Sequence, residues 1–216
     1  NLQQDRNGVV WFSRTRSGDD GGGVCRVADS KIHCFGKSEG VPVRLARCLV
    51  EGDIGSWWIC GGTGIIHWNG SSSRDYSVAG LNTVKDLVGI TSLVKDSDGS
   101  LWVGVDWQGK GLGLQHLVDG KLVPFIVPGI DSSSFEVVSL FFDRDHSLWI
   151  GTDRAGVYRI NGTTVDHFGA ADGLSSDDVN GFFQDREGNI WVTTSKGLDK
   201  FRETNVISYS KAEGLP

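Results

Sequence analysis

DVNGFFQDREGNIWVTTSKGLDKFRETNVISY, residues 178 to 209, contains four short runs that are rich in β-branched and aromatic residues. The runs cover 179–184, 189–194, 197–201 and 206–209, and the turn-forming tetrapeptide Asp185-Arg186-Glu187-Gly188 separates the first two. Short runs of this kind, with turn residues at intervals of about ten positions, are typical of antiparallel strands. We therefore expect one four-stranded meander, and because such a sheet cannot bury both of its faces alone, it requires neighbouring sheets.

The same unit recurs along the whole chain. Each copy has a tryptophan in its predicted second strand, and an acidic residue stands six or seven positions before it. A glycine opens the predicted third strand of every copy, and an aromatic residue follows that glycine twelve positions later. The tryptophans are Trp11, Trp58, Trp102, Trp149 and Trp191, and the glycines are Gly23, Gly64, Gly113, Gly156 and Gly197. Self-similarity with a period of about 40 to 50 residues indicates propeller blades or solenoid turns.

The repeat predicts an all-β fold, a β-propeller of four-stranded antiparallel blades with five repeats in one continuous array over residues 1–216. We place the blades at about 1–42, 43–86, 87–131, 132–174 and 175–216. Blade one has only Leu2-Gln3-Gln4 before its first turn, and 213–216 looks like the lead-in to a further blade. We expect part of a larger propeller, with a closed five-bladed ring as the alternative. An open arc would expose aromatic blade faces and favour association with a second copy.

A basic residue occupies the same place in the third predicted strand of every blade. These residues are Arg26, His67, His116, Arg159 and Lys200. Their regular recurrence indicates a device of the repeat and not five binding sites. We expect them at solvated, outward positions of strands whose flanking residues are buried.

The motif at 185–194, followed by Gly197-Leu198 and closed by Glu213-Gly214-Leu215-Pro216, resembles the two-component regulator propeller repeat. The resemblance covers essentially the whole chain as five copies and is strongest in the fourth and fifth. Such repeats occur in the extracytoplasmic sensor regions of bacterial hybrid histidine kinases, often as larger propellers, for example seven-bladed ones. The resemblance implies a periplasmic or extracytoplasmic module that senses a ligand. It also implies that the remaining blades or a kinase region belong to a longer chain.

Charge and composition exclude several classes of partner. The formal net charge is −6, and no basic cluster of the kind that binds phosphate groups is present, so we expect no nucleic-acid partner. No apolar run reaches the roughly 18 residues that a membrane-spanning helix needs. No serine or cysteine nucleophile comes with a recognisable base and orienting group. We therefore expect no catalytic residue, metal or cofactor in this segment, although a propeller active site assembled from several blades would leave no local motif.

The four cysteines lie in the first two blades, on neighbouring predicted strands. Cys25 and Cys34 flank a two-residue turn, and Cys48 and Cys60 lie on the first and second strands of blade two. Directly opposed β-carbons are close enough for a disulfide, and small buried thiols are the alternative. The spacings lack the C-x-x-C signature of a zinc site.

The connections between strands distinguish the two ends of the predicted propeller. The turns between first and second strands are short and alike, whereas the connections from second to third strands vary in length. Insertions in repeat proteins gather on one face, which is often the binding face. We expect a small polar molecule or an oligosaccharide on this variable face, with packing of Trp107 on a neighbouring blade as the alternative. The predicted ligand-binding residues are Arg14, Arg16, Asp106, Trp107, Asp153, Arg154, Asn180 and Lys196.

Three functions are compatible with these features. The first is a ligand-sensing propeller of a bacterial two-component signalling protein, which is what the family resemblance implies. The second is a propeller enzyme, a lyase or hydrolase acting on a polysaccharide. The third is a passive scaffold for protein interactions. Binding without turnover would indicate the sensor, and product formation would indicate the enzyme.

Overall fold

The computed structural model describes residues 1–14, 23–43, 46–61, 64–78, 81, 89–106, 112–126 and 130–202. These residues form five antiparallel sheets and three short 3-10 turns, which are η1 (Lys37–Glu39), η3 (Ser132–Ser134) and η4 (Ala170–Asp172). In the described part of the chain, no helix has the length and apolar character needed to cross a membrane. The predicted all-β propeller of antiparallel blades is confirmed.

Each sheet is one blade, and its strands follow one another in chain order. Blade one contains β1 (Leu2–Gln4), β2 (Val10–Ser13), β3 (Val24–Ala28) and β4 (Lys31–Phe35). Blade two contains β5 (Ala46–Glu51), β6 (Trp57–Gly61), β7 (Gly64–Trp68) and β8 (Ser73–Ser77). Blade three contains β9 (Ile90–Lys95), β10 (Leu101–Val105), β11 (Leu114–Val118) and β12 (Lys121–Pro124). Blade four contains β13 (Glu136–Phe142), β14 (Leu148–Asp153), β15 (Val157–Asn161) and β16 (Thr164–Phe168). Blade five contains β17 (Val179–Gln184), β18 (Ile190–Thr194) and β19 (Leu198–Phe201), and its predicted fourth strand at 206–209 lies outside the described residues.

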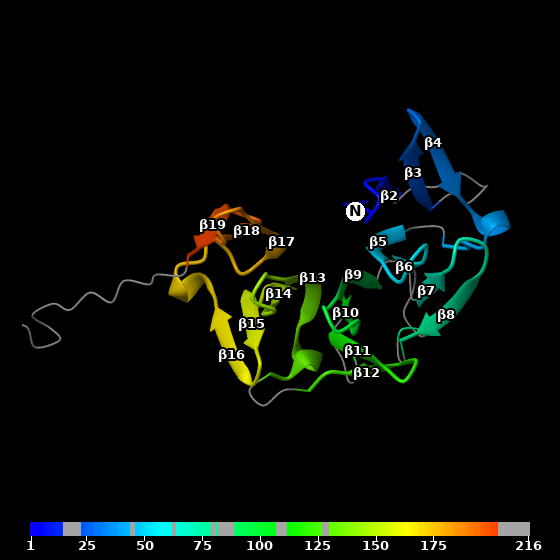
Figure 1. The fold of residues 1–216 in the computed structure, drawn as a ribbon. Coiled ribbons are helices and arrows are strands. Elements are labelled where there is room, and N and C mark those ends of the chain that lie inside the picture. Colours follow the sequence, from blue (N-terminus) through cyan, green and yellow to red (C-terminus); the bar gives the residue numbers. More distant parts are fainter. Residues whose placement is uncertain are drawn as a thin grey trace, which may run out of the picture.

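The blades fan around a common centre, with β5, β9, β13 and β17 innermost and β4, β8, β12 and β16 outermost (Figure 1). Each first strand packs against the first strand of the next blade, from β1 through β17. Four hydrophobic clusters fill the four junctions between consecutive blades. Among the described residues no comparable packing joins blade five to blade one, so the blades form an open arc. We call the end that carries the short turns between first and second strands the turn face, and the opposite end the loop face.

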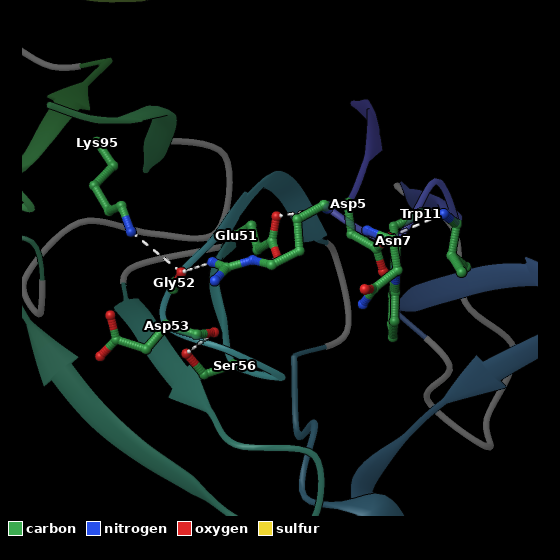
Figure 2. Close-up of polar contacts among 10 residues, drawn as sticks. Asp5, Asn7, Trp11, Glu51, Gly52, Asp53, Ser56 and Lys95 are labelled. Atoms are coloured by element: carbon green, nitrogen blue, oxygen red, sulfur yellow. Dashed lines mark hydrogen bonds and ion pairs between the residues drawn. The ribbon is translucent and has the colours of Figure 1, made fainter. Parts of the chain in front are cut away.

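In blades one, four and five, the acidic residue before the repeat tryptophan closes a turn and accepts the indole hydrogen. In blade three, Trp102 Nε1 is buried and has no hydrogen-bond partner among the described residues, and in blade two Glu51 accepts from Arg6 instead. Trp11, Trp149 and Trp191 donate through Nε1 to Asp5, Asp143 and Asp185 at 2.9, 2.7 and 2.8 Å, and Figure 2 shows the first of these contacts. Burial alone would raise the pKa of the Asp185 carboxyl, but hydrogen bonds from Trp191 and Asn189 outweigh burial and lower the pKa from 3.8 to about 2. In these three blades the six-residue spacing has a physical cause, because it brings an acceptor to a partly buried indole.

The basic residue of each third strand lies opposite the tryptophan of its own blade. The guanidinium or ammonium groups of Arg26, Arg159 and Lys200 lie 6.0, 5.6 and 5.0 Å from the ring centroids of Trp11, Trp149 and Trp191, and His67 and His116 stack on Trp58 and Trp102 at 4.3 and 4.4 Å. A cation over an indole face is attracted by the ring quadrupole. The expected solvated position is confirmed for Arg26 and Lys200, which are exposed, whereas His67, His116 and Arg159 are only partly exposed. All five side chains also cover the tryptophans, which the sequence did not predict. Because every blade has this contact, the basic residues are still interpreted as a feature of the repeat and not as five binding sites.

Both cysteine pairs form disulfides. Cys25 pairs with Cys34 across β3 and β4, and Cys48 pairs with Cys60 across β5 and β6. Of the two alternatives that the sequence left open, the disulfides are the correct one. In an open antiparallel blade these links fix strand pairing in the first half of the arc.

Candidate functional site

A β-bulge near the start of the first strand shapes the loop face of four blades. The pairing of β5 with β6 skips one residue between Ala46 and Cys48, and the same break recurs in β9, β13 and β17. The skipped residues are Arg47, Thr91, Val138 and Asn180. A bulge re-aims the side chain of the extra residue and is often found beside a functional site. The repeat therefore brings four variable side chains to the inner rim of the loop face.

Three carboxylates gather at this rim in blades three and four. Asp106 directly follows β10, and its backbone N–H donates to the Gly89 carbonyl oxygen at 3.0 Å. Glu136 begins β13, and Asp153, its direct cross-strand partner, ends β14. The starts of first strands and the ends of second strands meet at the same end of an antiparallel blade. The fold thus places an acid from one blade close to a pair of acids from the next.

Arg154 is the basic member of the cluster. Its backbone adopts the left-handed conformation with φ of 66°, and its Nη2 lies 3.1 Å from Asp153 Oδ2 and 3.8 Å from Glu136 Oε2. The Glu136 and Asp153 carboxyls are more enclosed than the guanidinium, which is largely exposed. Arg154 therefore partly neutralises the acid pair while keeping donor groups available to solvent or to a ligand.

The electrostatics of the cluster favour proton retention. Burial raises the pKa of Glu136, and the hydrogen bond with Asp153 and the negative charges of Asp106 and Asp153 raise it further, while Arg154 opposes them. Burial also raises the pKa of Asp106, where Arg47 opposes the shift and Asp153 adds to it. Neighbouring carboxylates resist joint ionisation because their like charges repel. The acid pair can therefore both donate and accept hydrogen bonds, as ligand hydroxyl or amino groups require.

The structure brings together three of the predicted site residues, Asp106, Asp153 and Arg154. Arg14 lies on blade one with its Nη1 3.8 Å from Cys34 Sγ, and Lys196 lies in an exposed turn of blade five. Asn180 is the exposed bulge residue of β17. Arg16 and Trp107 lie outside the described residues. Within the described part of the chain, no hydrogen bond or ion pair joins Arg14, Lys196 or Asn180 to the acid cluster, so their part in binding stays a prediction.

Sequence reasoning missed Glu136 and Arg47. Glu136 stands one residue before the first apolar residue of its strand, as Asp178 does in blade five, where Ser195 Oγ donates to Asp178 Oδ2 at 3.1 Å. An acid at this place in two neighbouring copies was a usable signal. The sequence held no comparable signal for Arg47, because the bulge that redirects its side chain is visible only in the pairing of β5 with β6. Within the described residues, no group of three His, Cys, Asp or Glu side chains has the arrangement of a metal site.

Comparison with known families agrees with the repeat. Residues 87–107, 132–154 and 173–196 match the family described as two component regulator propeller. These three segments carry two-component regulator propeller repeats. The matched segments cover the first strands and the acidic turns of blades three, four and five, including Glu136, Asp153 and Arg154. No curated protein is significantly similar to the chain.

Solved structures share the propeller fold at low sequence identity. The extracellular domain of a protein described as the hybrid two component system BT4673 from B. thetaiotaomicron is 16% identical, with a TM-score of 0.69 over 93% of this chain and 26% of that one. The corresponding domain of BT3049 is 22% identical, with a TM-score of 0.67 over 93% and 28%. Virginiamycin B lyase from Staphylococcus aureus is 16% identical, with a TM-score of 0.62 over 98% and 71%. The chain thus spans about a quarter of the two structures from two-component systems, and the fold is shared by these extracellular domains and by an enzyme.

Proposed function

We propose that this chain is the ligand-sensing part of an extracytoplasmic, periplasmic propeller in a bacterial two-component signalling protein. The two-component regulator propeller match and the extracellular sensor domains among its structural neighbours support this role. The chain spans only part of those neighbours, so the attached blades and kinase region belong to the proposal as well. The single observation that carries the site is the cluster of Asp106, Glu136, Asp153 and Arg154 at the rim of the loop face.

The chemistry of this cluster limits the class of ligand. Its acids outnumber the neighbouring arginines, and two of them hold protons more tightly than usual. An anionic ligand would be repelled, whereas a neutral or cationic ligand with several hydroxyl or amino groups could pair with both donors and acceptors. We therefore propose a polar small molecule or a neutral or amino-substituted oligosaccharide.

Isothermal titration calorimetry against neutral, amino-substituted and uronic-acid oligosaccharides would test this proposal. We expect binding to the first or second class and none to the third. Replacing Glu136 by glutamine or Arg154 by alanine should weaken binding about tenfold, which corresponds to one charged hydrogen bond. Lys121→Gln is the matched control, because Lys121 is exposed on the outer strand of blade three.

Other outcomes would select a different function. Chromatography of the titrated mixture reveals whether the oligosaccharide is cleaved, and new products would overturn the sensor in favour of a lyase or hydrolase. Binding that survives both site substitutions would move the site away from the acid cluster. Absence of heat with every class would leave the interaction scaffold as the better interpretation.

A further inference from the structure

In blades one, four and five, the aspartate that opens the turn between the first and second strands uses both of its carboxylate oxygens. Asp143 of blade four illustrates the arrangement. Its Oδ1 accepts from the backbone N–H groups of Asp145 and Ser147 at 3.0 and 2.8 Å, and its Oδ2 accepts from Trp149 Nε1 at 2.7 Å. The aspartates of blades one and five accept their indole hydrogens in the same way. We call this the inward position of the aspartate.

Blade three departs from this arrangement. Asp96 holds the same place in its turn, but its carboxylate contacts the next blade and not Trp102. Its Oδ1 accepts from the backbone N–H of Ser97 at 2.6 Å and lies 3.5 Å from His146 Nδ1 of blade four. The Trp102 Nε1 is buried and, within the described part of the chain, has no hydrogen-bond partner. Because an unpaired buried donor is costly, the outward position of Asp96 requires a compensating interaction.

The backbone of this turn is the same as in the other blades. The Asp96 N–H donates to the Ser100 carbonyl oxygen at 2.9 Å, and the Gly99 N–H donates to the Asp96 carbonyl oxygen at 3.0 Å. The corresponding two distances in blade four are both 3.1 Å. Asp98 Oδ1 accepts from the Ser100 N–H at 2.8 Å, a donor that the repeat aspartate takes in other blades. Asp96 therefore needs only a rotation of its side chain to reach the inward position.

His146 occupies a place in the turn of blade four where the other four blades have glycine. Its backbone is left-handed, with φ of 60°, and the glycines have φ between 75° and 90°. These glycines are Gly8, Gly55, Gly99 and Gly188. A left-handed backbone disfavours a residue that has a Cβ atom, although histidine tolerates it better than most. Among the described residues, the gain that offsets this cost is the contact between the imidazole and Asp96.

The acidic and basic groups around this pair keep their charge near neutral pH. Aspartate, lysine and arginine side chains do not ordinarily change charge between about pH 5 and 8, whereas histidine does. In blade four, Asp143 and Asp145 flank His146 in its own turn, and Arg144 donates to blade five. In blade three, Lys95 Nζ donates to the Gly52 carbonyl oxygen at 3.1 Å (Figure 2).

The remaining groups that face Trp102 belong to blade three. Hydrogen bonds from Ser100 lower the pKa of Asp98, so this carboxylate stays ionised. His116 stacks on Trp102 with its ring centroid at 4.4 Å, and its Nε2 is buried without a partner within the described residues. The His146 side chain is 62% exposed and can exchange a proton with solvent. Two histidines are therefore the groups near Asp96 that can titrate, and His146 is the one that contacts it.

We propose that Asp96 alternates between two partners and that the protonation of His146 decides between them. When His146 is protonated, the Asp96 carboxylate pairs with the imidazolium and joins blade three to blade four. When His146 has lost its proton to solvent, this attraction is lost, and Asp96 turns inward to accept the Trp102 indole hydrogen. The inward position is the one that Asp143 already holds in blade four. The contact is thus a pH-sensitive switch at an internal blade junction.

The switch lies on the two hairpins that carry the acid cluster at their opposite ends. β13 packs against both β9 and β10, so the hairpins lie side by side (Figure 1). Asp106 follows β10, and Glu136 and Asp153 begin β13 and end β14. A change of partner on the turn face therefore acts on the elements that form the proposed ligand site. This consequence rests on the proposed function, whereas the exchange of partners at Asp96 does not.

NMR of the indole N–H groups tests the exchange on the full chain without any ligand, and Trp102→Phe identifies the Trp102 signal. From about pH 5 to about pH 8, hydrogen exchange at Trp102 should slow about tenfold relative to Trp149, the effect of one added hydrogen bond. The ratio to Trp149 removes the general dependence of exchange on pH, because Trp149 is bonded throughout. His146→Gly restores the glycine of the other turns and should hold Trp102 in the slow state at both pH values. Asp96→Asn should also abolish the change, because an amide does not pair with an imidazolium.

Two other histidine variants make the test specific to His146. His116→Asn should retain the pH-dependent change if His116 is not its source. His33→Gln is the matched control, because His33 is exposed on β4 of blade one, and it should also retain the change. Far-UV circular dichroism at both pH values verifies that each variant is folded. The proposal is overturned if Trp102 exchange in the parent does not depend on pH, if the dependence survives His146→Gly, or if it disappears in folded His116→Asn.

Discussion

Replacing Trp149 by alanine should lower the free energy of unfolding by about 3–5 kcal/mol, the cost of deleting a large buried aromatic side chain. Trp149 is only 3% exposed and packs between Phe168 of its own blade and Phe182 and Phe201 of the next. Its Nε1 also donates to Asp143 at 2.7 Å. The substitution would remove the contact between blades four and five and leave a carboxylate without its partner.

Trp149→Phe separates these two effects. Phenylalanine keeps most of the apolar contact but cannot donate to Asp143, so we expect a loss of about 1–2 kcal/mol, the net value of one such hydrogen bond. Trp191→Ala is the matched control, because Trp191 makes the same bond to Asp185 but lies on the uncovered face of blade five. Because Trp191→Ala removes this bond together with a side chain that is only partly buried, its loss should be about 2–3 kcal/mol and smaller than that of Trp149→Ala.

Urea unfolding followed by far-UV circular dichroism measures all three values, since this signal does not depend on the tryptophans that are removed. Equal m-values are required for the comparison, because a changed slope would mean a changed unfolding transition. The reasoning would be refuted if Trp149→Ala unfolded at the parent's midpoint. It would also be refuted if Trp191→Ala cost as much as Trp149→Ala, because burial between blades would then not set the energy.

Three further predictions concern protonation and cross-links. Because the folded pKa of Asp185 is depressed to about 2, its contribution to stability should be present above pH 3.8 and lost as the pH falls toward about 2. In melting temperatures measured at decreasing pH, Asp185→Asn should lack the loss of stability that this carboxyl causes. The pKa of Glu136 is raised, so the stability that its protonated form contributes is complete below pH 4.5 and is lost as the pH rises through the folded pKa. The melting temperature of the parent should therefore fall over this pH range, and that of Glu136→Gln should lack this fall. Removing the Cys25–Cys34 link by double substitution with serine should cost about 2–3 kcal/mol in urea unfolding, given the short loop that it closes.

The sequence was sufficient for the blades because each carries its own local signals. The turn Asp185-Arg186-Glu187-Gly188 and the tryptophan six positions after Asp185 fix a hairpin and its buried face within one repeat. Contacts between blades were harder to predict, because they depend on which positions of neighbouring copies meet. Arg6 and Glu51 are 45 residues apart, and only the fold shows that one is the other's partner.

The same reasoning explains the partial success at the candidate site. Asp106 and Arg154 follow second strands and Asp153 ends one, and the rule that propeller loops bind ligands selected them from position alone. Glu136 was missed because it belongs to a strand and not to a loop. Its importance comes from cross-strand pairing with Asp153, which a one-residue change of register would remove.

The two faces of the arc carry different kinds of polar group, and this difference separates the packing of the blades from recognition. On the turn face, several polar side chains are committed to turns, tryptophans or neighbouring blades, as Asp143 and Arg144 illustrate. On the loop face, the cluster around Glu136 leaves an arginine exposed and two acids with raised pKa values. Polar groups that are already hydrogen-bonded stabilise one structure, whereas incompletely paired polar groups can still form favourable interactions with a ligand. Substitutions on the turn face should therefore act mainly on stability, and substitutions on the loop face mainly on binding.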